Sequence, residues 1–130
     1  MTTTRRAFLL GVALAATLGG VPAGTQSLEP VDVDWERVFR VAWEIGERYR
    51  KPHVIGRIEN ISGLYGANQI QLLVERLDAK GQPASQQVVW LGFRLNPGEH
   101  GFFDVPVSDR GATYRVRVYA FSRKMGTPGS

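Results

Sequence analysis

Metal binding is the first chemistry to consider, because imidazole and carboxylate groups are the usual ligands of protein-bound cations. Of the two histidines, His53 opens a predicted strand and His100 follows a Pro-Gly turn, where solvated imidazoles are ordinary. Asp32, Asp34 and Glu36 alternate along the chain, but the Gly and the later Glu of a calcium loop are missing. We therefore expect no metal site and no cofactor.

Nucleophilic catalysis has little support in the sequence. Ser62, Ser85 and Ser108 lie in predicted turns, none of them in a Gly-x-Ser-x-Gly elbow or near a histidine in sequence. The chain contains no cysteine, which excludes thiolate zinc sites, cysteine nucleophiles and disulfide frameworks. Asp104 and Asp109 form a candidate carboxylate pair, but turn capping is the commoner role of such aspartates. We therefore assign no catalytic residue and expect no enzyme.

A stripe of basic and aromatic side chains is the strongest candidate for a binding surface. It lies on the solvent face of the last predicted strand, 112–123, and consists of Arg115, Arg117, Tyr119, Phe121 and Arg123. Arginine with aromatic residues is typical of surfaces that contact a protein or an anionic glycan. Trp35 and Tyr65 can extend this surface, whereas we expect Trp90 in the core. If the strand lies at a sheet edge, it can also pair with a partner's strand or a second copy.

The arginines of this stripe also have a purely structural interpretation. On a solvated antiparallel sheet, an arginine of one strand pairs with a glutamate of the strand beside it. The candidate glutamates are Glu44, Glu59 and Glu75. Binding and cross-strand pairing both stay open at this point. We do not expect a nucleic acid partner, because the stripe is short and acidic residues elsewhere balance its charge.

The elements that position these residues are predicted to be strands. Alternating apolar and polar residues, with turn residues between the runs, predict strands at 38–45, 53–61, 69–77, 85–93, 101–107 and 112–123. The segment 35–49 also fits a helical period, but its β-branched and aromatic residues favour a strand. Gly81 and Gly98 mark tight turns, and Pro106 indicates an edge or a bulge. Six or seven short strands, with no room for crossover helices, predict an all-β, two-sheet antiparallel sandwich.

Length and composition fit one small globular domain. The chain has 130 residues, of which 43% are hydrophobic and 22% are charged, and its 15 Gly and 7 Pro supply many turns. We expect a flexible spacer at 24–34, one β-sandwich domain at 35–124 and a flexible tail at 125–130.

The first 23 residues have the order of an export signal. A pair of arginines precedes a mildly apolar run at 7–18, and Ala23 ends a small-residue site suited to cleavage by a signal peptidase. The apolar run is shorter than the roughly twenty residues that cross a bilayer, so we expect a signal helix and no permanent membrane anchor. The segment resembles a twin-arginine (Tat) signal peptide, which implies transient contact with the Tat translocase; a general secretory signal is the alternative. The residues that carry the resemblance are Arg5, Arg6, Phe8 and Leu9.

The order of turns and alternating runs between residues 52 and 121 resembles a known family. The matching residues are Gly56-x-Ile58-x-Asn60-x-Ser62-Gly63, Ile70-x-Leu72-x-Val74, Leu77-Asp78-Ala79-x-Gly81, Leu95-x-Pro97-Gly98-x-x-x-Phe102 and Tyr114-x-Val116-x-Val118. This order resembles the FxLYD-type family of small extracytoplasmic immunoglobulin-like domains. The resemblance implies an immunoglobulin-like β-sandwich that serves as an accessory or binding module. It implies no catalytic residue, because such domains have no chemistry in common.

These observations predict an exported, non-catalytic binding or accessory domain of the bacterial cell envelope, periplasmic or secreted, with a protein as its partner. Cleavage after Ala23 removes two arginines and no acidic residue, so the formal charge falls from +4 to +2. The global charge therefore gives little attraction to an acidic partner. The alternatives are a small accessory subunit of a Tat-exported enzyme complex and a module that binds anionic glycans or membrane surfaces. The sequence leaves the oligomeric state open.

Overall fold

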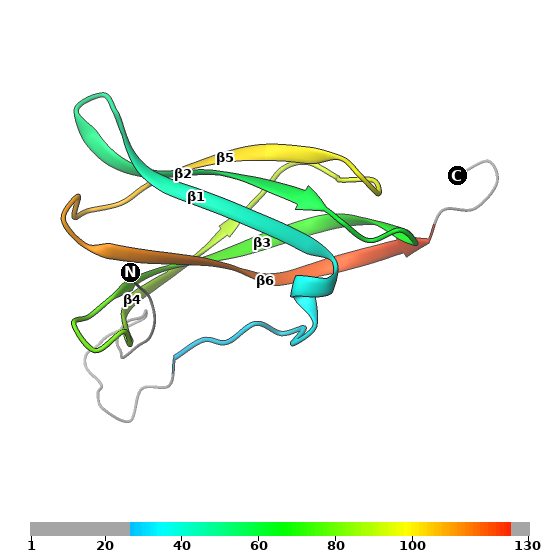
Figure 1. The fold of residues 1–130 in the computed structure, drawn as a ribbon, viewed down its shortest axis with the longest axis horizontal. Coiled ribbons are helices and arrows are strands. Elements are labelled where there is room, and N and C mark those ends of the chain that lie inside the picture. The colour runs from blue at the N-terminus through cyan, green and yellow to red at the C-terminus, as the bar shows by residue number, and fades with distance from the viewer. Residues whose placement is uncertain (1–26, 126–130) are drawn as a thin grey trace.

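The computed structural model describes residues 27–125, which form an all-β fold of two three-stranded antiparallel sheets. One sheet has the strand order β1-β2-β5 and the other has the order β4-β3-β6. Figure 1 shows the sheets as two layers of a sandwich-like fold, with β1 and β6 nearest the viewer. The elements are the 3-10 helix η2 (Trp35–Arg37), β1 (Phe39–Arg48), β2 (Lys51–Asn60), β3 (Tyr65–Leu77), β4 (Pro83–Trp90), β5 (His100–Pro106) and β6 (Thr113–Met125). The predicted export signal at 1–23 lies outside the described residues.

The predicted strands are confirmed, with some shifted ends. In the segment 35–49, which also fitted a helical period, η2 occupies the first three residues and the strand β1 follows. The third strand begins at Tyr65 instead of 69, because a bulge at Gln69, with φ of 51°, lets the chain keep pairing with β6. Gly81 and Gly98 have φ of 79° and 84°, which tight turns favour. Pro106 ends β5, an edge strand, where its missing N–H costs no ladder bond.

The core lies between the two sheets and is filled by every second residue of the paired strands. The predicted alternation of β6 is confirmed from Tyr114 to Val118, whose residues Tyr114, Val116 and Val118 are all buried. Beyond Val118 it is wrong, because the register of β6 shifts there and Phe121, predicted on the solvent face, packs against the core. The prediction for Trp90 is wrong, since its side chain is 64% exposed. Trp90 lies opposite Gln71 at the end of β4, and the next residue, Leu91, is the one that is buried. The buried apolar residues include Phe39, Val54, Ile58, Ile70, Leu72, Val74, Leu91, Leu95, Phe103 and Val105.

Two buried polar side chains fix the connections between the sheets. The amide nitrogen of Asn60 donates to the carbonyl oxygens of Tyr65 at 3.1 Å and Leu95 at 2.9 Å, while its oxygen accepts from the Ser62 N–H at 2.8 Å. Asn60 thereby ties the end of β2 to two connecting segments. The Tyr114 hydroxyl donates to the carbonyl of Asp109 at 2.9 Å and holds the turn that leads into β6.

The hairpin between β1 and β2 ends in a two-residue turn, Tyr49–Arg50, whose residues have φ of 55° and 65°. Asn-Gly is the pair that adopts this left-handed turn most easily, whereas bulky side chains are strained there. The Tyr49 side chain is 92% exposed, so packing does not offset the strain.

Replacing Tyr49–Arg50 by Asn-Gly is therefore expected to raise the free energy of unfolding by about 1–2 kcal/mol. Urea denaturation of the purified protein measures this change. The control Tyr49→Ser retains the strained turn and should leave the free energy of unfolding within about 0.5 kcal/mol of the wild type. Equal stabilisation by both variants would assign the effect to the exposed aromatic ring instead of the backbone.

Candidate binding groove between the two sheets

The arginines of the predicted stripe are held by a buried carboxylate. Arg115 Nε donates to Glu75 Oε1 at 2.8 Å, and Arg117 Nε and Nη2 donate to its two oxygens at 2.9 Å each. The Glu75 side chain is fully buried on the outer face of the central strand β3, and the Gln86 amide adds a further bond at 2.8 Å. The structure therefore shows cross-strand pairing of these arginines with Glu75.

The charge state of Glu75 follows from these contacts. Burial by itself raises the pKa of the carboxyl group, but the hydrogen bonds and positive charges of Arg115 and Arg117 outweigh it. The pKa of Glu75 is therefore lowered from its ordinary value of 4.5. At neutral pH the group is an ionised carboxylate between two guanidinium groups.

The rest of the stripe also makes contacts within the chain. The Phe121 ring meets Phe39 edge to face with centroids 4.9 Å apart, and the Arg123 guanidinium lies 4.9 Å from the Phe121 centroid. Arg123 also pairs with Asp32, and the Tyr119 carbonyl accepts from the Val31 N–H at 2.8 Å. Charge reversal at Arg115 and Arg117 would thus disturb folding before it tested binding.

Residues 28–32, which we call the strap, cross the outer face of the β4-β3-β6 sheet. The Gln86 amide pairs with both main-chain groups of Leu28, at 2.8 and 3.0 Å, much as a neighbouring strand would. Glu29 pairs with Arg117 at 3.0 Å, and Val31 is bound to β6 as described above. This part of the predicted spacer at 24–34 is therefore bound to the sheet, because its carboxylates and main chain find partners there.

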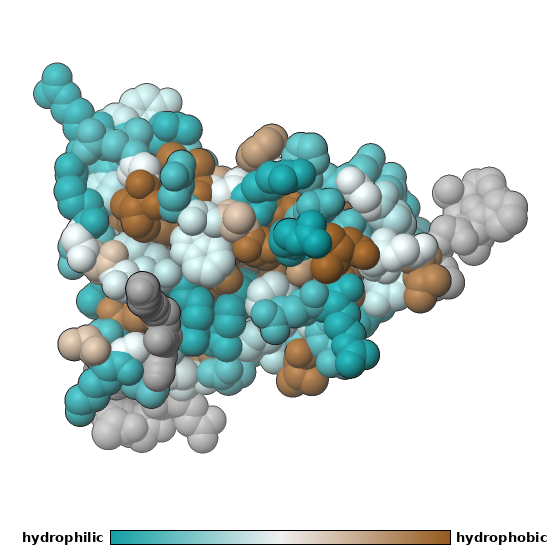
Figure 2. Space-filling model, in the orientation of Figure 1, coloured by the Kyte–Doolittle hydropathy of each residue, from teal (hydrophilic) through white to brown (hydrophobic). Residues whose placement is uncertain are grey.

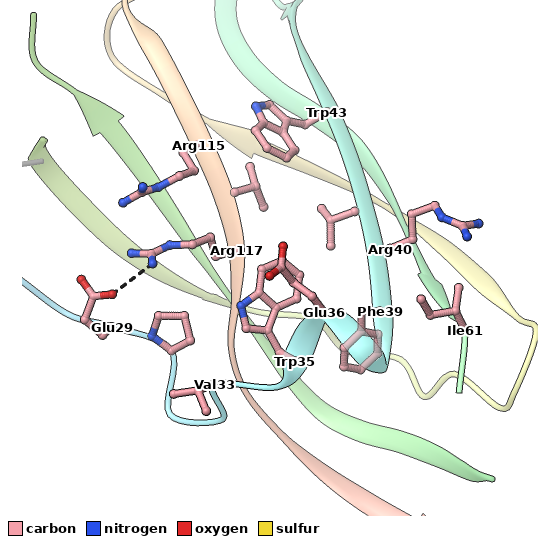
Figure 3. Close-up of a pocket in the computed structure, with 13 residues that line it drawn as sticks. Glu29, Val33, Trp35, Glu36, Phe39, Arg40, Trp43, Ile61, Arg115 and Arg117 are labelled. Carbon is pink, nitrogen blue, oxygen red and sulfur yellow. Dashed lines mark hydrogen bonds and ion pairs between the residues drawn. The ribbon is translucent and has the colours of Figure 1, made fainter. Parts of the chain in front are cut away.

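An open groove of about 690 Å³ lies between β1 and β6 and is bordered by the strap and η2. Figure 3 shows the Trp43 side chain on the side of β1 that faces β6, while Arg115 and Arg117 point to the opposite side of β6. The Trp43 indole N–H donates to the Tyr114 carbonyl at 3.2 Å, so it bridges the two sheets at one end of the groove. The apolar lining consists of Pro30, Val33, Trp35, Phe39, Val41, Trp43, Ile61 and Val116.

Residues 27–125 contain four edge strands, two in each sheet, and three of them carry a feature that hinders pairing with a further strand. β4 begins with Pro83 and β5 ends with Pro106, and proline cannot donate to a ladder. β6 contains a bulge and already accepts bonds from Val31 and from the Trp43 indole. Bulges, prolines and covering segments are the usual protection of sheet edges.

The edge of β1 lacks these features. β1 has ten residues and pairs with β2 in unbroken register. Within the described part of the chain, no main-chain group outside β2 bonds to the main chain of residues 39–48. On the side of β1 that faces the other sheet, Trp43 and Ile45 are each 38% exposed. Figure 2 shows this face of the molecule, where hydrophobic surface lies along β1 and near η2 between hydrophilic side chains.

Most charged side chains around the groove are paired. Arg40 pairs with Glu59 at 3.3 Å, Arg115 and Arg117 share Glu75, and Arg117 also pairs with Glu29 at 3.0 Å. Glu36, which lines the groove, and Glu44 on β1 have no ion-pair partner among residues 27–125. Glu36 and Glu44 can therefore each pair with a basic group of an apolar ligand.

The other residues considered for chemistry are engaged locally. His53 Nδ1 contacts Asp104, whose second oxygen pairs with Arg48 at 3.2 Å, and the His100 ring lies edge to face against Phe102. Asp109 accepts from the Gly111 N–H at 2.9 Å, the turn-capping role considered above. In the described ranges, no group of three or more His, Asp or Glu side chains is arranged to hold a metal ion.

Of the residues that line the groove, the sequence singled out Arg115, Arg117 and Trp35 as binding candidates, but not the apolar side chains of β1. Trp43 and Val41 were visible as an apolar alternation, but that pattern indicates a core face whether or not another strand covers it. No known protein family, curated protein or solved structure matches this chain. Residues 27–125 contain no helix long and apolar enough to cross a membrane.

Proposed function

We propose that this chain is an exported, non-catalytic binding domain that accepts an extended segment of a partner protein along the free edge of β1. The observation that carries the proposal is the regular, unprotected edge of β1 beside an apolar groove. An added strand gains affinity from main-chain hydrogen bonds and specificity from alternate side chains in pockets. Every second side chain of the bound segment would enter the groove beside Trp43.

An immunoglobulin-like assignment is part of this proposal and has two supports. The orders β1-β2-β5 and β4-β3-β6 correspond to those of an immunoglobulin-like sandwich without the last strand, which would lie beside β6. The bond from the Tyr114 hydroxyl to the main chain five residues upstream matches the tyrosine corner of that fold. Among residues 27–125 no strand pairs with the outer edge of β6, so the side of the fold between β1 and β6 is open there, and a partner's segment can cover it.

The chemistry of the groove defines the partner's segment. It is extended, has apolar side chains at alternate positions and carries a lysine or arginine near Glu36 or Glu44, the carboxylates without an ion-pair partner in the described chain. The twin-arginine-like signal and the FxLYD-like order of motifs support a partner in the cell envelope.

Selection from a phage-displayed library of random linear peptides tests the proposal. We expect the enriched peptides to alternate apolar residues and to contain a basic residue. Trp43→Ser should weaken a selected peptide about thirtyfold, because buried tryptophan contacts dominate such interfaces. Fluorescence polarisation with the labelled peptide measures the affinity.

Trp90→Ser is the matched control, since Trp90 is a more exposed tryptophan on β4, on the other side of the fold. It should change the affinity less than twofold, on the order of the effect of a residue outside the interface. Equal losses in both variants, or peptides selected without the expected pattern, would contradict binding at β1.

A further inference from the structure

The outer face of β1 carries charges that are complementary to a second copy of the same strand. Arg40, Glu44 and Arg48 follow one another at intervals of four residues, so they share that face. The Arg40 side chain is 68% exposed even in its ion pair with Glu59. Glu44 has no ion-pair partner in the described chain, although it lies between two arginines of its own strand.

Two identical antiparallel strands must be related by a two-fold axis, which limits the possible registers. If Ala42 faces its own copy, Arg40 of each chain lies opposite Glu44 of the other, and residues 39–45 of both strands overlap. If Glu44 faces its own copy, two glutamates meet and Arg40 lies opposite Arg48. If Trp43 faces its own copy, Arg40 lies opposite Gly46 and gains no ion pair.

Registers centred on Val41 or Ile45 place neither Arg40 nor Arg48 opposite Glu44, so the register centred on Gly46 is the one other arrangement that pairs opposite charges. It places Glu44 opposite Arg48, but residues 44–48 alone overlap, and Arg48 already pairs with Asp104. The register centred on Ala42 thus combines opposite charges with a longer ladder. It is the arrangement that electrostatics and main-chain pairing both favour.

The apolar side of β1 supports the same register. Val41 would lie opposite Trp43 of the second copy, and Phe39 opposite Ile45, each pair occurring twice. The two side chains on this strand that are 38% exposed, Trp43 and Ile45, would therefore gain apolar neighbours. The small, exposed Ala42 at the axis allows the two strands to approach closely.

We propose that two copies of this protein pair through antiparallel β1 edges centred on Ala42, which joins their sheets in the order β5-β2-β1-β1-β2-β5. The second copy then covers the open side of the groove. That this pairing competes with the partner's segment rests on the proposed function, whereas the pairing itself does not.

Charge exchange between Arg40 and Glu44 tests the pairing. Arg40→Glu and Glu44→Arg each bring two pairs of like charges together and should raise the dimer dissociation constant at least about tenfold. The double variant restores two opposite pairs and should return toward the wild-type constant. Light scattering after size-exclusion chromatography, over a range of concentrations, gives the constants. Both side chains are exposed, and circular dichroism confirms that the variants fold.

Single cysteines test the register, because the chain has no cysteine of its own. Ala42→Cys should form an intermolecular disulfide on mild oxidation, since Cα atoms opposite one another in an antiparallel pair lie about 4.5–5.5 Å apart. Glu44→Cys is the control and should not crosslink at the same rate. Preferential crosslinking at 44, a monomer at every concentration, or a double variant no better than the single ones would overturn the proposal. Peptide binding by the monomeric Arg40→Glu variant, which retains Glu36, Glu44 and Trp43, tests the proposed function separately.

Discussion

Replacing Glu75 by alanine is expected to lower the free energy of unfolding by about 3–5 kcal/mol. The substitution removes the carboxylate to which Arg115 and Arg117 both donate, and it leaves two largely covered guanidinium groups without that partner. The cost of an unpaired charge in a buried position is larger than the strength of an average surface ion pair. Chemical denaturation of the purified protein measures the loss.

Glu47→Ala is the matched control. Glu47 pairs with Arg110 at 2.7 Å, but both side chains are more than half exposed, so its removal should cost less than about 1 kcal/mol. Similar losses for the two variants would contradict the buried network as a main source of stability.

The same network predicts a pH dependence with a definite sign. The pKa of Glu75 is lowered in the folded protein, so its stabilising contribution is complete above the ordinary value of 4.5 and is lost as the pH falls below it. The difference in unfolding free energy between the wild type and Glu75→Gln should therefore shrink from neutral pH to about pH 3. Denaturant titrations at several pH values measure this difference. A difference that does not change with pH would show that the ionised state of Glu75 is unimportant.

Replacing Arg5–Arg6 by Lys-Lys is expected to abolish export almost completely if the chain uses the twin-arginine route. A receptor that reads the planar, multiply donating guanidinium groups does not accept lysine as an equivalent. Immunoblotting of periplasmic and cytoplasmic fractions measures the exported share of the protein.

The double substitution retains the positive charge of the signal, so a general secretory signal would still function. Unchanged export would therefore assign the protein to the general route. Thr3→Arg, which leaves the arginine pair intact, should be exported normally in either case.

The strands could be predicted because their sequence pattern reports on local geometry. In β6, the alternation of Tyr114, Val116 and Val118 with polar residues reflects the two faces of one strand. Gly81 and Gly98 mark turns because their backbone conformation is local too. These features depend on residues close together in the chain, which a single sequence displays directly.

The features that could not be predicted depend on what lies across space. Trp90 is a large apolar residue of the kind usually found in a core, yet it is the last residue of β4 and its side chain lies on the outer face of the sheet. The strap looks like a polar spacer, and nothing near it in sequence shows that Gln86 and Arg117 will bind it. The three candidate glutamates could not be ranked, because register decides that Glu75 lies opposite Arg115.

The groove could not be predicted for a related reason. Val41, Trp43 and Ile45 alternate in the same way as residues of a fully covered strand. Their partial exposure results from the arrangement of six strands, with β1 and β6 both at the edge of their sheets. An unpaired edge is a property of the whole topology, and no short motif encodes it.

The strap has a consequence for the order of events in folding. The bonds from Arg117 to Glu29 and from Arg123 to Asp32 join residues 88 and 91 positions apart, which places them among the longest loops that this chain closes. Contacts between residues so far apart in sequence require a large loss of chain entropy before they stabilise the folded state, and they slow folding. During synthesis, the strap can meet Gln86 of β4 first, but its partners on β6 leave the ribosome last. A chain truncated before β6 would therefore leave both the strap and the carboxylate of Glu75 without their arginine partners.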